Sequence, residues 1–454
     1  MGTGVRYGGV ERASSGGMLI GGIDMRHEEH DVLVVGSGAG GATVAREFTK
    51  RGKTVQVVER GEYATKLGNF RNILPYFDAN RITRTPRKSN EGVILWRTQM
   101  AGGSTIVSCG NGTRCLEQEF SDFGIALDRE FAEAEAEMGL APIDDSLLSD
   151  GSRVIAEAAH DLGYEMEPMP KFIDPERCKT CGQCVMGCPN DAKWNATRYL
   201  DEAIDAGADV TYQTIVERVL IEGGKAVGVE GTGPRGRPVV CRAKAVILSA
   251  GGLGTPVILQ NSGIQDAGSQ FFTDLLVNVY GVTDGVNLLR EPPMAMVNHE
   301  FHADRGFILS PYINHNRLVR AMELGPRGLS LPANRLLGLM VKTADSLTGR
   351  VFPDGSVSKP VTDEDQARLD EGAAIATEIL VKAGADPKSV VLSGLQGGHP
   401  GGTAAIGRVV NENLQTSVDG LFVCDASVLP RAPGMPPILT LVALGKWLAR
   451  RMAA

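Results

Sequence analysis

The chain has 454 residues, and its 46 Lys and Arg residues against 54 Asp and Glu residues give a formal net charge of −8. This acidic balance provides no basic face for nucleic acid, so we exclude a nucleic-acid-binding function. With 43% hydrophobic residues the chain can bury a large core, and we expect two interleaved domains in one globular protein.

Residues 1–29 are rich in glycine and polar side chains and lack the basic-then-apolar plan of a secretory signal peptide. We expect a flexible lead here, with folded structure beginning near His30. No apolar run in the sequence approaches the roughly 18 residues that a membrane-spanning helix needs. The sequence therefore predicts a cytoplasmic protein without a membrane span.

The most informative segment follows directly and reads Asp31-Val-Leu-Val-Val-Gly36-Ser-Gly38-Ala-Gly-Gly41. It joins a short apolar strand to a helix through glycines at the spacing that lets backbone approach a pyrophosphate. Gly36 makes the tight turn, Gly38 admits the phosphates, and Gly41 lets the helix pack closely. The segment predicts a dinucleotide-binding site.

The context of these glycines strengthens that prediction. A helical pattern runs through residues 42–50, a second strand is predicted over residues 54–58, and Glu59 stands at its end. An acidic residue in this place accepts a hydrogen bond from a ribose hydroxyl, which favours an unphosphorylated adenosine ribose such as that of FAD or NAD. The alternative is a glycine turn in an ordinary α/β domain, and the complete strand–helix–strand unit disfavours it.

The next elements alternate between helices and strands. Amphipathic helices are predicted over residues 127–139, 150–162 and 199–206, and strands over residues 216–221, 225–230, 238–242 and 245–250. Residues 266–362 are weakly patterned, and we expect them to build the substrate side. The acidic run that starts at Thr362 caps a long helix, which reaches about Ala383 and stops at Gly384.

Four of the eight cysteines lie within residues 178–188, where the chain reads Cys178-Lys-Thr-Cys181-Gly-Gln-Cys184-Val-Met-Gly-Cys188-Pro. This is the spacing of bacterial ferredoxins, and thiolates on such a loop can converge on the irons of a [4Fe–4S] cluster. Because the fourth cysteine of a ferredoxin run usually serves a second cluster, either Cys188 folds back or a distant cysteine completes the set. The distant candidates are Cys109, Cys115, Cys241 and Cys424. Tetrahedral zinc, or structural thiols or a disulfide, are the alternatives.

Four separated segments together resemble the glucose-methanol-choline (GMC) oxidoreductases. The first is the glycine turn with Glu59, and the second is Gly102-Gly-Ser104-Thr-Ile-Val-Ser-Cys-Gly110. The third is Val246-Ile-Leu-Ser-Ala-Gly-Gly-Leu-Gly-Thr-Pro256 with Asn261-Ser-Gly263. The fourth runs from His399-Pro-Gly-Gly-Thr403 through Asp425 to the helix that follows Pro436.

The resemblance implies a Rossmann-type α/β FAD-binding domain with an inserted α+β substrate domain. We place the FAD-binding domain in residues 30–120, 196–265 and 391–454, helices and the cysteine-rich loop in 121–195, and the substrate domain in 266–390. The resemblance also implies that the protein binds FAD and oxidises an alcohol by hydride transfer to the flavin. The cofactor-binding residues that it indicates are Gly36, Gly38, Gly41, Glu59, Gly102, Gly103, Ser104, Val216, Ala250, Gly251, Asp425, Ala426, Pro436 and Pro437.

Three of these positions also make physical sense without the resemblance. Asp425 ends an apolar strand, where an acidic group can bind the ribityl or phosphate part of the flavin or cap the following turn. Pro436 and Pro437 open a helix whose N-terminal amides would face the flavin pyrimidine. Such a terminus stabilises negative charge on a reduced flavin.

His399 is the catalytic residue that the resemblance indicates, because imidazole can accept the hydroxyl proton near neutral pH while hydride leaves the carbinol carbon. Family members usually carry a second histidine or an asparagine just before the C-terminal helix. This chain instead reads Gly434-Met-Pro-Pro-Ile-Leu-Thr440. Either His399 works alone, or another polar group such as Asn111 fills the gap. His299, His302 or His315 are further candidates for the substrate pocket.

These features lead to three functional hypotheses. A cluster beside a flavin passes single electrons onward, which favours an alcohol dehydrogenase that delivers electrons to an acceptor protein or quinone. An oxygen-using alcohol oxidase with structural cysteines is the second hypothesis. A flavin and iron–sulfur electron-transfer component without small-molecule chemistry is the third, and the intact segment around His399 argues against it.

Overall fold

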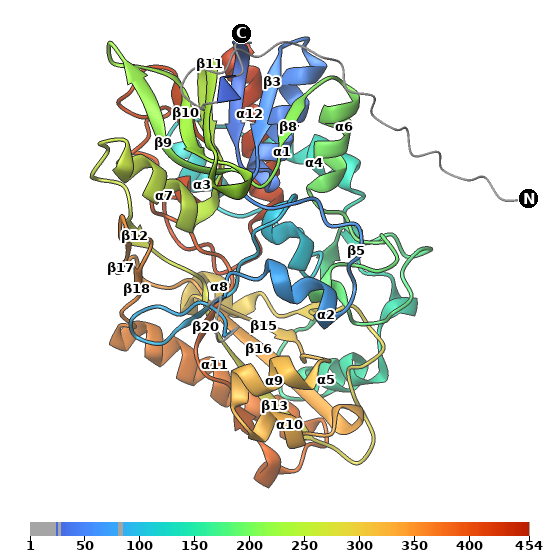
Figure 1. Cartoon of the computed structure of the whole chain (residues 1–454). Coiled ribbons are helices and arrows are strands. Elements are labelled where there is room, and N and C mark those ends of the chain that lie inside the picture. Colours follow the sequence, from blue (N-terminus) through green and yellow to red (C-terminus); the bar gives the residue numbers. More distant parts are fainter. Residues whose placement is uncertain (1–23, 26–28, 80–84, 454) are drawn as a thin grey trace, which may run out of the picture.

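Two mixed sheets form the frame of the molecule, one in each half of the view in Figure 1. The structure is a computed structural model that describes residues 24–25, 29–79 and 85–453. Most of the lead predicted over residues 1–29 therefore lies outside the described residues. Within it, β1 (Asp24–Met25) pairs in parallel with β11 (Pro238–Leu248).

The first sheet is the one that the glycine turn enters. Its strand order is β8-β3-β2-β11-β10-β9, and β1 and β21 also pair with β11. The bounds are β2 (His30–Val35), β3 (Val55–Val58), β8 (Asp209–Thr211), β9 (Ile215–Glu222), β10 (Lys225–Thr232) and β21 (Leu421–Val423). Parallel pairing of β8, β3, β2, β11 and β21 confirms the Rossmann-type α/β fold.

One strand differs from the sequence prediction. The strands predicted over residues 238–242 and 245–250 are a single strand, β11. Residues 238–242 pair antiparallel with β10, and residues from Ala243 onward pair in parallel with β2. The patterning changes along the strand because the first half lies in a partly exposed meander and the second half is buried between parallel neighbours.

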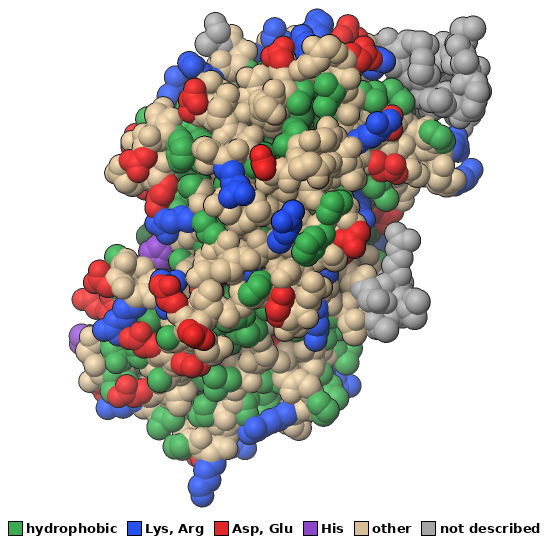
Figure 2. Space-filling model, turned by 90° about the vertical axis from the view of Figure 1, so that its left-hand side faces the viewer, with side chains coloured by type: hydrophobic (Ala, Val, Ile, Leu, Met, Phe, Trp, Pro, Cys, Tyr) green, Lys and Arg blue, Asp and Glu red, His purple; other side chains and the backbone are tan. Residues whose placement is uncertain are grey.

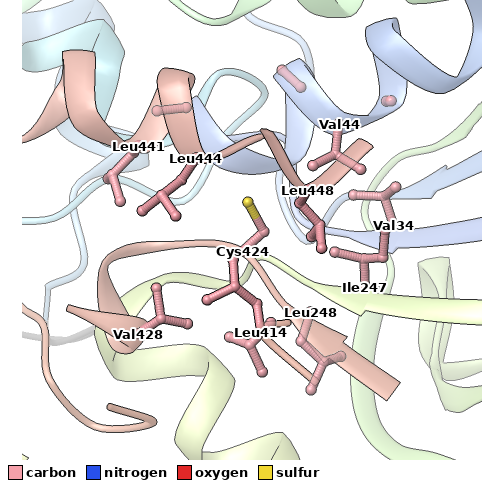
Figure 3. Close-up of a cluster of buried hydrophobic side chains, with 14 of the residues drawn as sticks. Val34, Val44, Ile247, Leu248, Leu414, Cys424, Val428, Leu441, Leu444 and Leu448 are labelled. Carbon is pink, nitrogen blue, oxygen red and sulfur yellow. The ribbon is translucent and has the colours of Figure 1, made fainter. Parts of the chain in front are cut away.

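A helical layer covers one side of this sheet. The helix after the glycine turn, α1 (Ala39–Lys50), packs against α12 (Ile438–Ala453) and α6 (Thr197–Asp205), and α12 also contacts α4 (Asp128–Met138). Figure 3 shows the core between these helices and the strands, where Cys424 lies among leucines of α12. This packing joins the start of the fold to its C-terminal helix.

The second sheet has the order β15-β16-β13-β20-β4, with β19 also paired to β13. Its strands are β4 (Ile94–Leu95), β13 (Leu275–Val282), β15 (Phe307–Pro311), β16 (Leu336–Thr343), β19 (Val391–Leu392) and β20 (Gln396–Gly397). The long helix α11 (Asp363–Lys382) starts at a capping box on Thr362 and packs on β13, β15 and β16. Because β16 is buried along its whole length, it lacks the alternation that identifies half-exposed strands.

The remaining elements are short and connect these layers. The helices are α2 (Phe70–Ile73), α3 (Glu117–Asp122), α5 (Asp150–Asp161), α7 (Gly251–Asn261), α8 (Glu300–Arg305), α9 (Arg317–Leu324) and α10 (Arg327–Ser330). The strands are β5 (Ala141–Pro142), β6 (Glu167–Pro168), β7 (Pro170–Lys171), β12 (Ser269–Phe271), β14 (Met296–Val297), β17 (Gly349–Val351) and β18 (Val357–Ser358). The 3-10 turns are η1 (Leu74–Tyr76), η2 (Gly103–Val107), η3 (Asp145–Leu147), η4 (Cys184–Met186), η5 (Pro234–Gly236), η6 (Ala333–Arg335), η7 (Pro387–Ser389) and η8 (Ala426–Val428). The domain boundaries given above remain a prediction.

The surface carries charges of both signs. On the face in Figure 2, lysine and arginine side chains alternate with aspartate and glutamate side chains over both halves of the molecule. Among the described residues, no helix is both long and apolar enough to cross a membrane.

Candidate active site

A cavity of about 610 Å³ lies where the two sheets meet. Its lining includes residues at the carboxyl ends of β2, β3 and β11, and side chains from β13 and β16 of the second sheet. The carboxyl edge of a parallel sheet is where nucleotides bind in folds of this class. The cavity therefore has a nucleotide end on the first sheet and a second end on the other.

The glycine turn after β2 forms part of the cavity wall. Gly36 has a φ of +96°, and a Cβ there would lie 2.3 Å from the carbonyl oxygen of Ser249, so a side chain cannot fit. Gly38 lines the cavity, and a Cβ there would have no heavy atom within 4 Å. Gly41 does not line the cavity; it lets α1 approach β2, because a Cβ there would lie 2.1 Å from the carbonyl oxygen of Gly36. The close contacts at Gly36 and Gly41 and the open space at Gly38 agree with the backbone geometry that the sequence predicts for these glycines.

Gly40 has a similar packing requirement that the sequence reasoning missed. A Cβ there would lie 2.0 Å from the carbonyl oxygen of Cys424, which follows β21. The second of four consecutive small residues at the start of α1 therefore fixes the distance between this helix and β21. The signal in the sequence is the Gly40-Gly41 pair itself, because two adjacent glycines at a helix start disfavour the helix unless packing requires them.

Glu59 lies at the carboxyl end of β3 and lines the cavity. Its Oε2 accepts hydrogen bonds from the backbone N–H of Ser37 at 2.9 Å and from the Ser37 hydroxyl at 2.7 Å. Its Oε1 accepts from the N–H of Gly61 at 2.8 Å. Burial raises the pKa of Glu59. The carboxylate therefore ties the glycine turn to the next strand at the edge of the nucleotide end.

Three helices begin at the cavity. The N-cap of α1 is Gly38 and that of α7 is Ala250, and neither caps its helix with a side chain. Pro436 and Pro437, directly before α12, also line the cavity. Unpaired amides at helix starts carry partial positive charge and bind anionic groups.

Asp425 lines the cavity and also holds two of these segments together. Its Oδ2 accepts from the Gly251 N–H at 2.8 Å and from the Thr255 hydroxyl at 2.5 Å, and its Oδ1 accepts from the Ser427 N–H at 2.7 Å. Both interpretations of Asp425 are thus compatible, because it caps the η8 turn and also faces the cavity.

The segment around the second glycine pair lies across from the first glycine turn. Gly103 and Ser104 line the cavity, and a Cβ on Gly103 would lie 3.1 Å from the Cα of Gly38. Gly102 does not line the cavity; its N–H donates to the Ser37 hydroxyl at 3.2 Å and thereby fixes the loop against the turn. Val216, Ala250, Gly251 and Ala426 complete the set of predicted residues that line the cavity.

His399 lines the other end of the cavity and is paired with an aspartate that the sequence reasoning missed. Its Nδ1 lies 2.7 Å from the Oδ2 of Asp274, and the Oδ1 of Asp274 accepts from the N–H of Gly434 at 2.9 Å. Asp274 is fully buried beside the start of β13. Its sequence signal is one carboxylate inside an apolar stretch, Phe271-Phe-Thr-Asp-Leu-Leu-Val277.

Burial determines the protonation of this pair. It lowers the pKa of the His399 imidazole well below 6.5, and the nearby Lys342 ammonium acts in the same direction. Burial also raises the pKa of the Asp274 carboxyl to about 7, while Lys342 opposes that rise. His399 is therefore neutral near pH 7. Because Nδ1 faces Asp274, the remaining ring nitrogen, Nε2, is available as a proton acceptor.

The other polar candidates from the sequence have different positions. His299, His302 and His315 do not line the cavity. The Nε2 of His302 lies 2.7 Å from the carbonyl oxygen of Pro433, and that of His315 lies 3.1 Å from that of Leu288. Asn111 does line the cavity, but its Oδ1 already accepts from the buried Lys171 ammonium.

The four clustered cysteines line a second, small cavity of about 10 Å³. They belong to the loop between Ile173 and Lys193, and Cys184 starts the η4 turn, which contacts η2. The next two residues, Val185 and Met186, line the large cavity. The cysteine loop thus reaches the large cavity through a single turn of backbone.

No three Cys, His, Asp or Glu side chains in the described part of the chain are placed to hold a single metal ion. This does not fit the zinc alternative, which needs four ligands around one ion. Of the distant cysteines, Cys424 lies in the helix–sheet core (Figure 3) and Cys115 is within 3.1 Å of the Thr440 hydroxyl. Cys241 is buried within β11. Cys109 lines the large cavity near Cys184.

Comparison with protein families matches this architecture along most of its length. The N-terminal domain of GMC oxidoreductases matches residues 30–276, and the C-terminal domain matches residues 345–445. The chain belongs to the GMC oxidoreductase family. It is therefore a flavoprotein oxidoreductase, of the enzyme type that acts on CH–OH groups, and its family binds FAD.

Individual relatives cover nearly the whole chain. An uncharacterized protein of Methanocaldococcus jannaschii is 29% identical over 426 residues, which cover 93% of this chain and 100% of that protein. Long-chain-alcohol oxidase FAO3 of Arabidopsis thaliana is 24% identical, over 95% of this chain and 69% of its own length. The crystal structure of pyridoxine 4-oxidase from Mesorbium loti superposes with a TM-score of 0.70 at 17% identity, over 93% of this chain and 99% of that one. This last likeness shows the GMC fold.

The residues present fit the FAD of the GMC family. Gly38 leaves space beside the start of α1, and Glu59 stands at the end of β3 for a ribose. Arg97, which the sequence reasoning missed, lines the same cavity; it pairs with Asp78 at 2.9 Å, but its buried Nε has no hydrogen-bond partner among the described residues. These groups, with the starts of α1, α7 and α12, would hold the dinucleotide.

Proposed function

We propose that this GMC oxidoreductase oxidises the hydroxyl group of a small-molecule alcohol to a carbonyl. The observation that carries the proposal is the His399–Asp274 pair, with its Nδ1 to Oδ2 distance of 2.7 Å, at the end of the cavity away from the nucleotide turn. The bound FAD supplies the hydride acceptor. His399 takes the hydroxyl proton on Nε2, and Asp274 fixes the ring and stabilises the imidazolium that results.

The substrate is an alcohol with an apolar body. The cavity lining at this end comes largely from apolar side chains of β13, β16 and neighbouring loops, among them Leu276, Met294, Tyr312 and Met340. Such a wall selects ligands by apolar contact, and a few polar groups orient the reacting atom. The relation to a long-chain-alcohol oxidase agrees with this substrate class.

The cysteine loop holds a [4Fe–4S] cluster in this proposal. All four cysteines line one cavity, and each thiolate would bind a different iron corner, so they need not converge on one ion. Such a cluster, held by Cys178, Cys181, Cys184 and Cys188, would supply one-electron transfer toward an acceptor protein or quinone. None of the eight cysteines, all of which the structure describes, forms a disulfide, which agrees with a reducing compartment such as the cytoplasm.

The substrate reaction is tested by anaerobic reduction of the flavin in the purified holoenzyme. Benzyl alcohol, 1-dodecanol and pyridoxine are each mixed with the oxidised enzyme, and bleaching of the flavin band is followed with analysis of the carbonyl product. We expect benzyl alcohol or 1-dodecanol to bleach the flavin and yield its aldehyde, whereas bleaching by the polar alcohol pyridoxine alone would overturn the apolar substrate class. Failure of all three, with FAD bound, would overturn the proposal of apolar alcohol oxidation.

The electron route needs a separate measurement. Iron and labile sulfide are determined on protein purified without oxygen, and hydrogen peroxide is measured during turnover in air. About four irons per chain, lost when Cys178 and Cys181 are both replaced by Ser while FAD stays bound, support the relay. Flavin without iron, together with one peroxide per alcohol oxidised, would replace it with an oxidase that uses its cysteines structurally.

A further inference from the structure

Lys342 is an unpaired, buried lysine in the wall of the large cavity. Its side chain belongs to β16, is only 4% exposed and lines the same cavity as His399. Within the described residues its ammonium forms neither an ion pair nor a hydrogen bond; its electrostatic partners, Asp274 and Cys109, act from a distance. Burying an ammonium without partners is costly, because its hydration is lost and no protein group replaces it.

The other buried lysines of the described chain show how unusual this is. The Lys171 ammonium donates to the carbonyl oxygens of Cys109 and Pro293, and that of Lys193 donates to two carbonyl oxygens of the η2 turn. Lys359 pairs with Asp345 at 2.9 Å, and Lys446 pairs with Glu137 at 2.8 Å. Each of these four cations is satisfied by the protein. Lys342 instead faces a ligand cavity.

The register of the second sheet places Lys342 beside the catalytic pair. Lys342 is directly opposite Leu276 on β13, whose side chain lines the same cavity, and Asp274 lies two residues before Leu276, outside the strand and with a φ of +48°. The Lys342 ammonium acts electrostatically on both Asp274 and His399. Met340, two residues earlier on β16, lines the cavity as well.

We propose that Lys342 is a catalytic residue whose ammonium donates a hydrogen bond to the hydroxyl oxygen of the substrate. This inference rests on the proposed alcohol oxidation. As the O–H bond breaks and the proton moves to Nε2 of His399, negative charge grows on the oxygen, and the ammonium stabilises it. The carbinol C–H bond then breaks with its electron pair leaving as hydride to the flavin, and the C=O bond forms.

In this proposal Lys342 supplies the second polar group that the segment before α12 lacks. The segment Gly434-Met-Pro-Pro-Ile-Leu-Thr440 offers no second histidine or asparagine. A donor from β16 approaches the reacting atom from the second sheet instead of from the C-terminal segment. A cation can also support more developing charge than a neutral amide can, because charge-assisted hydrogen bonds are roughly twice as strong.

The proposal is tested first by ligand binding, which needs no turnover. Benzoate carries the negative charge that the reacting oxygen acquires, and benzamide is its neutral counterpart; the perturbation of the flavin spectrum reports both in the FAD-loaded enzyme. In Lys342→Met we expect benzoate binding to weaken at least about tenfold while benzamide binding changes less than about twofold. Lys342→Arg retains the preference for benzoate, and the exposed Lys388→Met is the matched control. Equal binding of benzoate by wild type and Lys342→Met overturns the inference.

Kinetics then separate this inference from the proposed function. The rate of flavin reduction by the alcohol that reduces the wild type fastest should fall about 10²–10³-fold in Lys342→Met, the usual loss for one donor to a developing oxyanion. If the wild type is reduced and Lys342→Met is reduced equally fast, Lys342 is not catalytic although the enzyme oxidises alcohols. If no alcohol reduces the wild type, it is the proposed function that fails.

Folding provides the last control. Because methionine removes an unpaired buried charge and keeps a similar volume, Lys342→Met should unfold at the same or a higher temperature than the wild type. A variant that fails to fold or to bind FAD would show that the lysine is structural, and the inference would be wrong.

Discussion

The two ends of the large cavity are built from different parts of the polypeptide. At the nucleotide end, the wall is mostly backbone, with glycines and helix starts from α1 and α7 that face the ligand space. At the other end, which we assign to the substrate and call the substrate end, the proposed reactive groups are side chains: His399 in the loop after β20, Asp274 just before β13 and Lys342 on β16. The first end recognises a cofactor common to a family, whereas the second is adjusted to one reaction.

The two ends therefore contribute differently to the enzyme, one to cofactor binding and the other to the rate of the reaction. The nucleotide end needs space and amides, so its failure removes the cofactor. The substrate end needs protonatable groups in a fixed arrangement, so its failure leaves a loaded but slow enzyme. Variants at the two ends should therefore differ in flavin content as well as in rate.

The largest effect is expected at the nucleotide end. In Gly38→Val, the new side chain enters the space beside the start of α1, where a Cβ meets no protein atom within 4 Å, so the fold tolerates it and the pyrophosphate does not. We expect purified protein of near wild-type stability without bound FAD, and no activity. Flavin absorbance and thermal unfolding measure this. The matched control is Gly394→Ala, at an exposed glycine outside the cavity, and normal FAD binding by Gly38→Val would contradict the assignment.

The next effect concerns the base at the substrate end. His399→Ala removes the proton acceptor and leaves the nucleotide end intact, so FAD content should match the wild type. The rate of flavin reduction by alcohol should fall by about 10⁴-fold, the upper range for general base catalysis. Anaerobic stopped-flow absorbance checks it. Unchanged reduction would remove His399 from the mechanism.

Asp274→Asn should have an intermediate effect. The amide keeps the shape of the side chain, but it provides no negative charge for the imidazolium and can present its NH₂ to Nδ1. We expect flavin reduction to slow by about 10²–10³-fold with normal FAD content, which is less than the loss expected when the base itself is removed. A rate within a factor of two of wild type would assign Asp274 to structure alone.

The smallest expected effect is on the pH dependence of folding stability, and it arises from a group outside the cavity. Burial raises the pKa of Glu291, a carboxyl outside the cavity that accepts hydrogen bonds from Ser149 and Ser152, to about 7. The folded state thus binds this proton more tightly than the unfolded chain, whose pKa is about 4.5. The resulting stability is present below about pH 4.5 and is lost as pH rises through about 7.

Glu291→Gln removes this titration. Between pH 5 and pH 8 the unfolding free energy of the wild type should fall by about 2–3 kcal/mol more than that of the variant. Denaturant unfolding at several pH values measures the difference. Parallel pH profiles for the two proteins would show that Glu291 does not titrate in this range.

The sequence predictions for the nucleotide end rest on local signals. Gly36, Gly38 and Glu59 occupy one strand–helix–strand unit, and the spacing of these residues carries the geometry. Gly41 and Gly102 serve packing and loop fixation and do not face the ligand. The long helix after Thr362 was found for the same reason, since its cap and its stop are adjacent to it in the sequence.

The substrate end was only partly predictable. His399 was identified through its family motif, but Asp274 lies 125 positions away and no local pattern joins the two residues. Asp274 and Lys342 do share a signal: each is a single charge in an otherwise apolar strand segment. The tertiary structure that brings them together cannot be read from the sequence, because a fully buried strand such as β16 has no alternation.

The origin of the cavity wall affects how the enzyme matures. The turn at Gly36 and the prolines before α12 come from opposite ends of the described chain, and α1 packs directly on α12. A ribosome-bound chain that has not yet released α12 therefore lacks one wall of the cofactor pocket. FAD can bind tightly only once α12 has packed on α1, and its binding then stabilises the closure of the turn at Gly36 against α12. Cofactor supply in the cell would set how many newly made molecules keep that closure.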